Sequence, residues 1–298
     1  MASANPSRAR QLYFERRSLF DNNPRPSIYI NTVSPGLSRL LIDAFVAWGW
    51  KVTVAICSDE WGGSWEDKLP QNEHVRIQEY VNMGVAYDIE HATQDYGSAP
   101  LDCFVDLAGA EWRACNRECG PDKRLTLNLK YMVTDTYHWI KAFTPNLRLS
   151  RDPKVVLITS VAPQLIEGLK YADYKGDIRP PRGKNLVLAL KAQAIAKDAR
   201  RSMFMTLPDM MQLDTQLSKG RTTYLQIHPG NECGHRLSET LERDNATSIA
   251  RTITLTKRVD SGKFLTSGGE NVDMRQPYTV CQDWSVPEGF GPNGELFG

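Results

Sequence analysis

The sequence has no excess of charge of either sign. Its 36 lysine and arginine residues are balanced by 35 aspartate and glutamate residues, which gives a formal net charge of +1. No cluster of basic residues is long enough to follow a phosphate backbone, so nucleic acid is not expected as a partner. A membrane is not expected either, because no run reaches the roughly 18 apolar residues of a membrane span.

Closely paired cysteines are scarce, and a secretory leader is not expected. Six cysteines are scattered along the chain, and only Cys115 and Cys119 lie close together, with no second Cys/His pair at a matching spacing. We therefore expect reduced thiols and no metal. Residues 1–26 hold several arginines but no continuous apolar segment, so they do not resemble a secretory signal. These observations predict a soluble, cytoplasmic protein.

The chain does contain a regular alternation of short apolar segments and longer amphipathic ones. Strands are predicted at 27–30, 51–56, 74–78, 101–105, 155–159, 222–227 and 262–265, and helices at 40–48, 83–96, 125–143 and 184–203. Strands that alternate with helices predict a parallel sheet with right-handed crossovers. We expect an α/β protein with a doubly wound, Rossmann-like parallel sheet, whose ligand crevice lies at the carboxyl ends of the strands.

The length and composition predict a single domain with tails. A chain of 298 residues with 41% hydrophobic content can bury one large core. We assign residues 1–26 to an N-terminal extension, 27–272 to the Rossmann-like domain and 273–298 to an irregular C-terminal tail. Residues 171–183 form a polar, proline-containing loop inserted after the fifth strand, and loops of this length are usually functional or mobile.

Seven short motifs follow the predicted strands or open the predicted helices. They are 31–38 (NTVSPGLS), 106–109 (DLAG), 127–129 (LNL), 158–160 (ITS), 184–191 (KNLVLALK), 228–230 (HPG) and 261–264 (SGKF). In order and spacing they resemble the TGxxxGxG turn, the NNAG motif, the asparagine helix, the serine strand, the lysine helix, the PG motif and the closing TGxxL segment of the short-chain dehydrogenase/reductase superfamily. The resemblance covers about residues 27 to 272 and implies a dinucleotide-binding enzyme fold.

The resemblance implies a set of cofactor-binding positions, several of which depart from the family pattern. The positions are Thr32, Ser34, Gly36, Leu37, Ser58, Ala108, Gly109, Pro229 and Gly230. Gly36 is the one glycine left of three in the phosphate-binding turn, and side chains at Thr32 and Ser38 are expected to hinder the usual cofactor pose. Ile56 replaces the acidic residue that would bind a ribose, which disfavours NAD. We expect either that no cofactor is required or that NADP is retained.

The active-site tyrosine of the family is also missing. Pro180 stands four residues before Lys184, and proline has no ionisable group to supply the proton that accompanies hydride transfer. The resemblance implies that Ser160, Lys184 and Asn128 still form a hydrogen-bonding site that polarises a carbonyl.

Four further side chains are candidates for proton transfer or substrate contact. Tyr171 and Tyr174 lie in the inserted loop, where either is a candidate substrate contact or a displaced acid. Glu111 lies beside Trp112 just past the fourth predicted strand, and an acid near an indole can have a raised pKa. His228 precedes the Pro-Gly turn beside the expected nicotinamide position.

These residues predict an enzyme that acts on a hydrophobic, carbonyl-containing small molecule in secondary metabolism. The missing phenol favours a redox-neutral reaction, namely a cyclisation, isomerisation, dehydration or pericyclic step. Two alternatives stay open: an NADPH-dependent ketoreductase with a displaced tyrosine acid, and an inactive partner subunit. The helices at 125–143 and 184–203 match those through which family members often dimerise, which implies a homo-oligomer.

Overall fold

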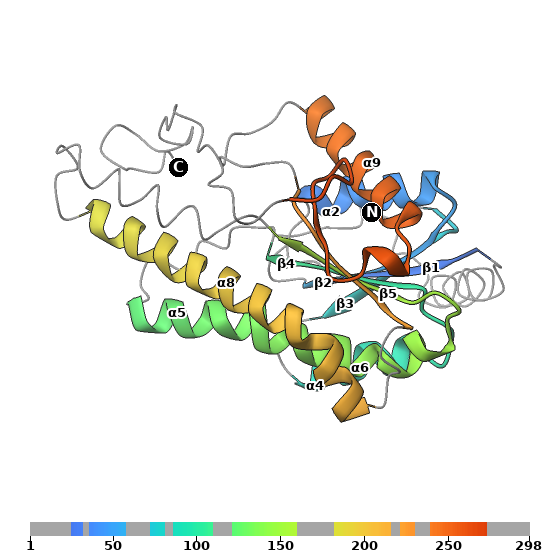
Figure 1. Cartoon of the computed structure of the whole chain (residues 1–298), viewed down its shortest axis with the longest axis horizontal. Helices are drawn as coiled ribbons and strands as arrows, with labels where there is room; N and C mark the ends of the chain where they lie inside the picture. Colours follow the sequence, from blue (N-terminus) through green and yellow to red (C-terminus); the bar gives the residue numbers. More distant parts are fainter. Residues whose placement is uncertain are drawn as a thin grey trace, which may run out of the picture.

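The chain folds into a seven-stranded parallel sheet between two layers of helices (Figure 1). The structure is a computed structural model, and it describes residues 25–31, 36–57, 72–80, 86–109, 121–159, 182–215, 221–229 and 239–272. The strands are β1 (Ser27–Asn31), β2 (Lys51–Cys57), β3 (Val75–Tyr80), β4 (Cys103–Gly109), β5 (Lys154–Thr159), β6 (Thr223–Ile227) and β7 (Phe264–Leu265). They lie in the order β3-β2-β1-β4-β5-β6-β7.

Helices connect the strands and cover both faces of the sheet. They are α2 (Gly36–Ala47), α4 (Ala86–Tyr96), α5 (Pro121–Leu129), α6 (Asp135–Leu149), α8 (Arg182–Thr215) and α9 (Glu239–Leu255). A π-helical turn, η1 (Lys130–Thr134), joins α5 to α6, and a 3-10 turn, η3 (Arg258–Asp260), precedes β7. Among the described residues, none of the helices combines the length and the apolar character that crossing a membrane requires.

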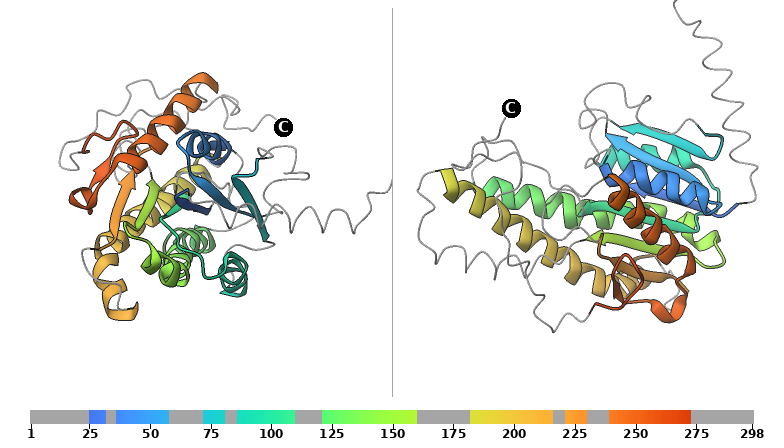
Figure 2. Two further views of the ribbon diagram at one scale, coloured as in Figure 1. Left: turned by 90° about the vertical axis from the view of Figure 1, so that its right-hand side faces the viewer. Right: turned by 90° about the horizontal axis from the view of Figure 1, so that it is seen from above.

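The alternation of side chains along β1 explains how the two layers are held. Successive residues of a strand point to opposite faces of the sheet. Ile28 and Ile30 therefore lie in the core shared with α2 and α9, whereas Tyr29 lies in the core shared with α4, α6 and α8. Figure 2 shows these two layers on opposite sides of the sheet.

The core under α6 and α8 is rich in aromatic rings. Tyr29 on β1 and Phe104 on β4 stack with ring centroids 5.9 Å apart and an interplanar angle of 8°. Phe143 of α6 lies 4.2 Å from Tyr29, and Trp139 stacks on Phe143. Burying each such ring stabilises the fold by roughly 1.5–3 kcal/mol. This layer is the rigid base directly beneath the polar groups described below.

The strand order fixes where a ligand can bind. Because β1 lies between β2 and β4, the chain winds outward in both directions from the β1/β4 pair, and folds with this strand order bind ligands outside the carboxyl ends of these strands. The amino-terminal half of α8 and helix α5 lie side by side and extend past that end of the sheet (Figures 1 and 2).

The predicted fold class, a doubly wound parallel sheet, is confirmed, and the predicted strands are all present with slightly different ends. The four predicted helices are present, but two of them have clearly different bounds. The helix predicted at 125–143 is interrupted by η1 and runs to Leu149, and the one predicted at 184–203 extends from Arg182 to Thr215. Helix α9 was not predicted at all. Its buried positions do follow a helical spacing, but its many threonines and isoleucines have low helix propensity.

Candidate functional site

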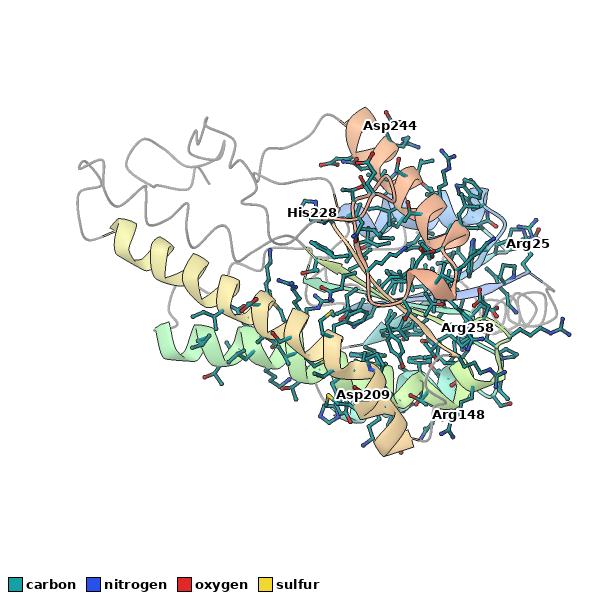
Figure 3. The ribbon with its side chains drawn as sticks, viewed as in Figure 1. Arg25, Arg148, Asp209, His228, Asp244 and Arg258 are labelled. Atoms are coloured by element: carbon teal, nitrogen blue, oxygen red, sulfur yellow. The ribbon has the colours of Figure 1, made fainter. Side chains whose placement is uncertain are left out.

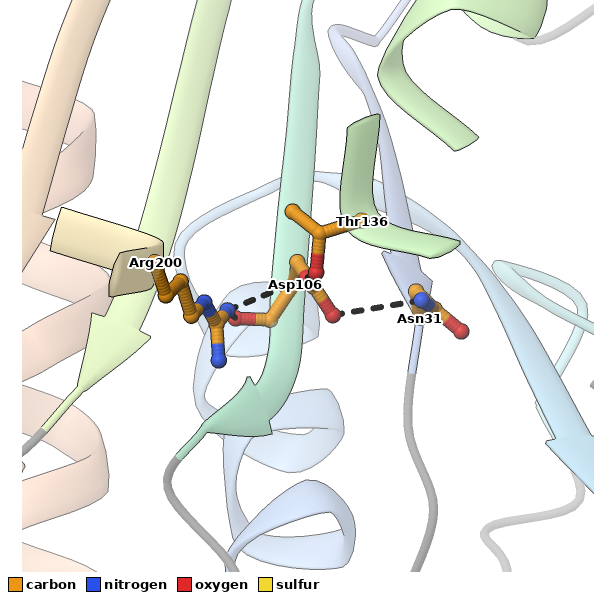
Figure 4. Close-up of polar contacts among 4 residues, drawn as sticks. All are labelled: Asn31, Asp106, Thr136 and Arg200. Carbon is orange, nitrogen blue, oxygen red and sulfur yellow. Dashed lines mark hydrogen bonds and ion pairs between the residues drawn. The ribbon is translucent and has the colours of Figure 1, made fainter. Parts of the chain in front are cut away.

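Four buried polar side chains meet where β1 and β4 separate, and we refer to Asn31, Asp106, Thr136 and Arg200 as the Asp106 cluster (Figure 4). Asn31 ends β1 and is the register partner of Asp106 on β4. Its Nδ2 donates a hydrogen bond to Asp106 Oδ1 at 3.1 Å, and Thr136 Oγ1 donates one to Asp106 Oδ2 at 2.5 Å. The cluster therefore joins two strands and α6 through one carboxylate.

Arg200 brings α8 to the same carboxylate. Its Nη2 donates hydrogen bonds to Asp106 Oδ2 at 3.0 Å and to the Asp106 backbone oxygen at 3.1 Å. Both side chains are 0% exposed. Burial lowers the pKa of Arg200, and the charge of Asp106 opposes that shift. A charge-assisted pair of this kind offsets much of the cost of removing two ions from water.

Two local irregularities position these side chains. The register between β4 and β5 shifts between Asp106 and Gly109, and bulges of this sort re-aim side chains beside active sites. On the helical side, η1 ends directly before Asp135 and Thr136. Isolated π turns inside helices occur frequently at functional sites.

Lys197 and His228 lie at the same end of the sheet. Lys197 precedes Arg200 by three positions on α8, so the two share one helix face, and it is 8% exposed. His228 directly follows β6 and is 3% exposed. Its backbone N–H donates a hydrogen bond to the backbone oxygen of Leu265 at 2.8 Å. Figure 3 shows His228 at the end of the sheet opposite Arg25 and Arg258.

The burial of these two groups changes their acidity. Burial, assisted by the charge of Arg200, lowers the pKa of Lys197 to about 8. Burial, assisted by the charge of Lys197, lowers the pKa of His228 to about 4. At neutral pH the site therefore holds a protonated lysine of increased acidity near a neutral imidazole. Such a lysine is an effective proton donor, and a neutral imidazole is able to accept a proton.

Acidification is expected to destabilise the protein through His228. Its pKa is about 4 in the folded chain, against the model value of 6.5. The neutral imidazole therefore contributes full stability above about pH 6.5, and this contribution is lost as the pH falls through about 4. Between pH 7 and pH 4, the free energy of unfolding measured in urea should fall by about 3 kcal/mol more in wild-type protein than in His228→Gln. Equal losses in the two proteins would contradict a buried, neutral histidine.

Five of the predicted cofactor-binding positions lie among the described residues. Gly36 begins α2 and the partly buried Leu37 follows it, Ala108 and Gly109 end β4, and Pro229 is buried after His228. All five therefore lie near the carboxyl ends of β1, β4 and β6. The amino end of α2, which follows β1, is the kind of site at which a phosphate is favoured. Their predicted role in binding a cofactor stays a prediction.

The residues around the ends of β1 and β2 do not fit NAD. Ser38 is fully buried at the position of the third family glycine, where the side chain is enclosed between helix and sheet. Ile56, the penultimate residue of β2, is also fully buried and supplies no carboxylate to a ribose hydroxyl. No hydride-transfer step follows from these side chains.

Two of the predicted catalytic residues lie on the helices that extend past the sheet. Asn128 is buried near the end of α5, and Lys184 lies in the first turn of α8. Lys184 precedes Lys197 by 13 positions, which is about 20 Å along a helix. The two lysines therefore cannot both contact one small ligand at the Asp106 cluster. The side chain of Lys184 is not among those described, so its catalytic role stays a prediction.

The remaining predicted site residues lie outside the described residues, and their roles stay predictions. They are Ser160, Tyr171, Tyr174, Glu111, Thr32, Ser34, Ser58 and Gly230, together with Pro180. In the sequence, Ser160 directly follows Thr159, the last residue of β5. Within the described ranges, no group of three or more His, Cys, Asp and Glu side chains could hold a metal ion.

Sequence reasoning missed Lys197, Arg200 and Thr136. A signal for Lys197 was available, because Gln193 stands four residues before it on the same helix. Gln193 and Lys197 thus have the same four-residue spacing as Pro180 and Lys184. For Arg200 and Thr136 no local signal existed, because their shared partner Asp106 is distant in the sequence.

Known proteins resemble this chain in structure but not closely in sequence. No protein-family model matches the sequence, and none of the curated proteins matches it. A carbonyl reductase from chicken fatty liver with bound NADPH has a TM-score of 0.63 at 13% identity, covering 83% of this chain and 98% of that one. The carbonyl reductase Sniffer of Drosophila melanogaster has a TM-score of 0.61 at 14% identity, covering 83% and 99%.

A third similar structure is described as a short-chain dehydrogenase/reductase. This protein of Burkholderia multivorans, with bound NADP, has a TM-score of 0.57 at 16% identity, covering 84% of this chain and 99% of that one. In all three, nearly the whole neighbouring chain is matched. The chain therefore has the fold of the short-chain dehydrogenases/reductases.

Proposed function

We propose that this chain is an enzyme that acts on a carbonyl-containing small molecule at the carboxyl ends of β1, β4 and β6, by a redox-neutral reaction. The observation that carries the proposal is the environment of Lys197. It is a buried lysine beside Arg200 and His228, and Gln193 occupies the position one helical turn before it. The site thus has an acid and a neutral imidazole, and neither Pro180 nor Gln193, each four residues before a lysine, supplies a phenol.

The chemistry that suits these groups is enolisation. The Lys197 ammonium donates a hydrogen bond to the carbonyl oxygen and, with a pKa of about 8, a proton to it as negative charge develops. His228, neutral because its pKa is about 4, is the candidate base that takes the proton from the adjacent carbon. The resulting enol is the common intermediate of isomerisation, dehydration and cyclisation. Ser160 is proposed as a further donor to the carbonyl, since it directly follows β5.

A second candidate function is NADPH-dependent reduction of a carbonyl. It is favoured by the descriptions of two of the structural neighbours, which contain NADPH or NADP. In this case Tyr171 or Tyr174 of the inserted loop would supply the proton. The fully buried Ile56 supplies no carboxylate to a ribose hydroxyl, which disfavours NAD and leaves NADPH open.

Exchange of hydrogen for deuterium separates the two functions. A panel of cyclic and aromatic ketones is incubated in D2O with the purified protein and without any nicotinamide. We expect the protein to exchange the protons next to the carbonyl of one of these ketones for deuterium, and proton NMR measures this exchange. Lys197→Met should slow this exchange at least about 100-fold, because the developing enolate loses its proton donor. Substrate-dependent oxidation of NADPH, with no exchange in its absence, would establish the reductase instead.

A further inference from the structure

The hydrogen-bonding capacity of Arg200 is only partly used within the described residues. A guanidinium has five N–H groups, and Nη2 directs its hydrogen bonds to Asp106. Nε and Nη1 have no hydrogen-bond partner among the described residues, and the side chain is 0% exposed. Buried donors without acceptors are costly, most of all on a charged group. An acceptor supplied by a bound ligand would remove this cost.

The geometry points to the carboxyl-end crevice. In Figure 4, one nitrogen of the Arg200 guanidinium points away from Asp106, in the direction in which β4 ends. Asn31 lies on the other side of Asp106, and its Oδ1 also has no hydrogen-bond partner among the described residues. The cluster thus directs donors, and one acceptor, to the place where this fold binds ligands.

The charges around Arg200 favour an anion in that place. Lys197 lies on the same helix face, close enough for the Arg200 charge to act on it. Asp106 is the acid that pairs with Arg200, and it is shared with Asn31 and Thr136. The nearby acid Asp135 is paired with Lys130 at 2.9 Å. The charges of Arg200 and Lys197 therefore repel each other, and an anion bound between them would relieve this repulsion.

We propose that Arg200 binds a carboxylate of the substrate, whose class is therefore an oxo acid: the carboxylate lies at Arg200 and the carbonyl at Lys197. Arg200 is a specificity-determining residue in this arrangement, held in place by Asp106. That the bound oxo acid is a substrate rests on the proposed function, whereas the anion site itself does not.

The test is a comparison of an acid with its neutral ester. Phenylpyruvate and its methyl ester are titrated into the protein by calorimetry at pH 7, and wild-type protein is expected to bind the acid about 10- to 100-fold more tightly, as hydrogen bonds to a charged group allow. Asp106→Leu/Arg200→Met removes both charges and so keeps the core neutral. This double variant should bind acid and ester with affinities within about 3-fold of each other. Arg201→Met, on the same helix, is the matched control and should keep the preference.

Several results would overturn the proposal. They are equal affinity of wild-type protein for acid and ester, no binding of the acid at millimolar concentration, or a preference that survives in the double variant. Inorganic phosphate is titrated in parallel, and Arg200-dependent phosphate binding tighter than that of phenylpyruvate would assign the site to a phosphate and overturn it too. An Arg200-dependent preference for the acid without proton exchange or turnover would contradict the proposed function and leave the anion site in place.

Discussion

Arg200→Met is expected to lower the free energy of unfolding by about 3–5 kcal/mol, because it leaves the carboxylate of Asp106 buried without its cationic partner. Asn31 and Thr136 would still donate hydrogen bonds to Asp106, but neither carries a charge. Urea unfolding followed by circular dichroism at pH 7 measures the loss. It is the largest stability effect that we expect from a single substitution in the site.

The double variant Asp106→Leu/Arg200→Met shows how the stability effect of removing both charges differs from that of removing one. Its stability should return to within about 2 kcal/mol of wild type, since a buried ion pair is often replaced by apolar residues at little cost. Arg201→Met should change stability by less than about 0.5 kcal/mol, as is usual away from the core. A single variant as stable as wild type would show that Asp106 and Arg200 are not paired in the core.

Lys197→Met is expected to lower kcat by about 100- to 10,000-fold, the usual contribution of a positioned general acid. Lys184→Met should change it by less than about 3-fold, because Lys184 lies 13 positions away on the same helix. The readout is exchange or turnover of the substrate identified in D2O. The rate of wild-type enzyme should fall as the pH rises through about 8, where Lys197 loses its proton.

The comparison of the two lysines has clear contrary outcomes. A large loss in Lys184→Met with a small one in Lys197→Met would show that Lys184 is the catalytic lysine. Ser160→Ala tests the neighbouring donor in the same assay. If none of these variants changes the product formed, the chain is better explained as an inactive subunit that keeps the fold for its surface.

The sheet could be predicted because its signals are local. Each strand is a short apolar run, and the turn after Asn31 and the segments at Asp106 and His228 carry recognisable motifs. Their order along the chain also placed His228 correctly after β6. Helix α9 escaped because its threonines and isoleucines are poor helix formers, although burial against α2 and the sheet stabilises it.

The two lysines of α8 show what local reasoning leaves open. The motif beginning at Lys184 resembles the family's lysine helix, and a single sequence contains nothing that says how far a helix extends before it reaches the sheet. Helix α8 has 34 residues, and Lys197, not Lys184, lies where the described structure packs a buried lysine beside His228. Because 13 helical positions separate them, the two lysines lie about 20 Å apart along α8.

The sequence by itself determined the parallel sheet, its helical layers and the end at which we propose that a ligand binds, because strand and helix periodicity and short turns are encoded by neighbouring residues. Only the tertiary structure decided which side chains meet there. Arg200 lies 94 positions from Asp106, and Thr136 lies 30 positions from it. A charged pair between such distant residues depends on the rotation of each helix against the sheet, and this rotation is fixed by the packing of the aromatic core rather than by any local pattern.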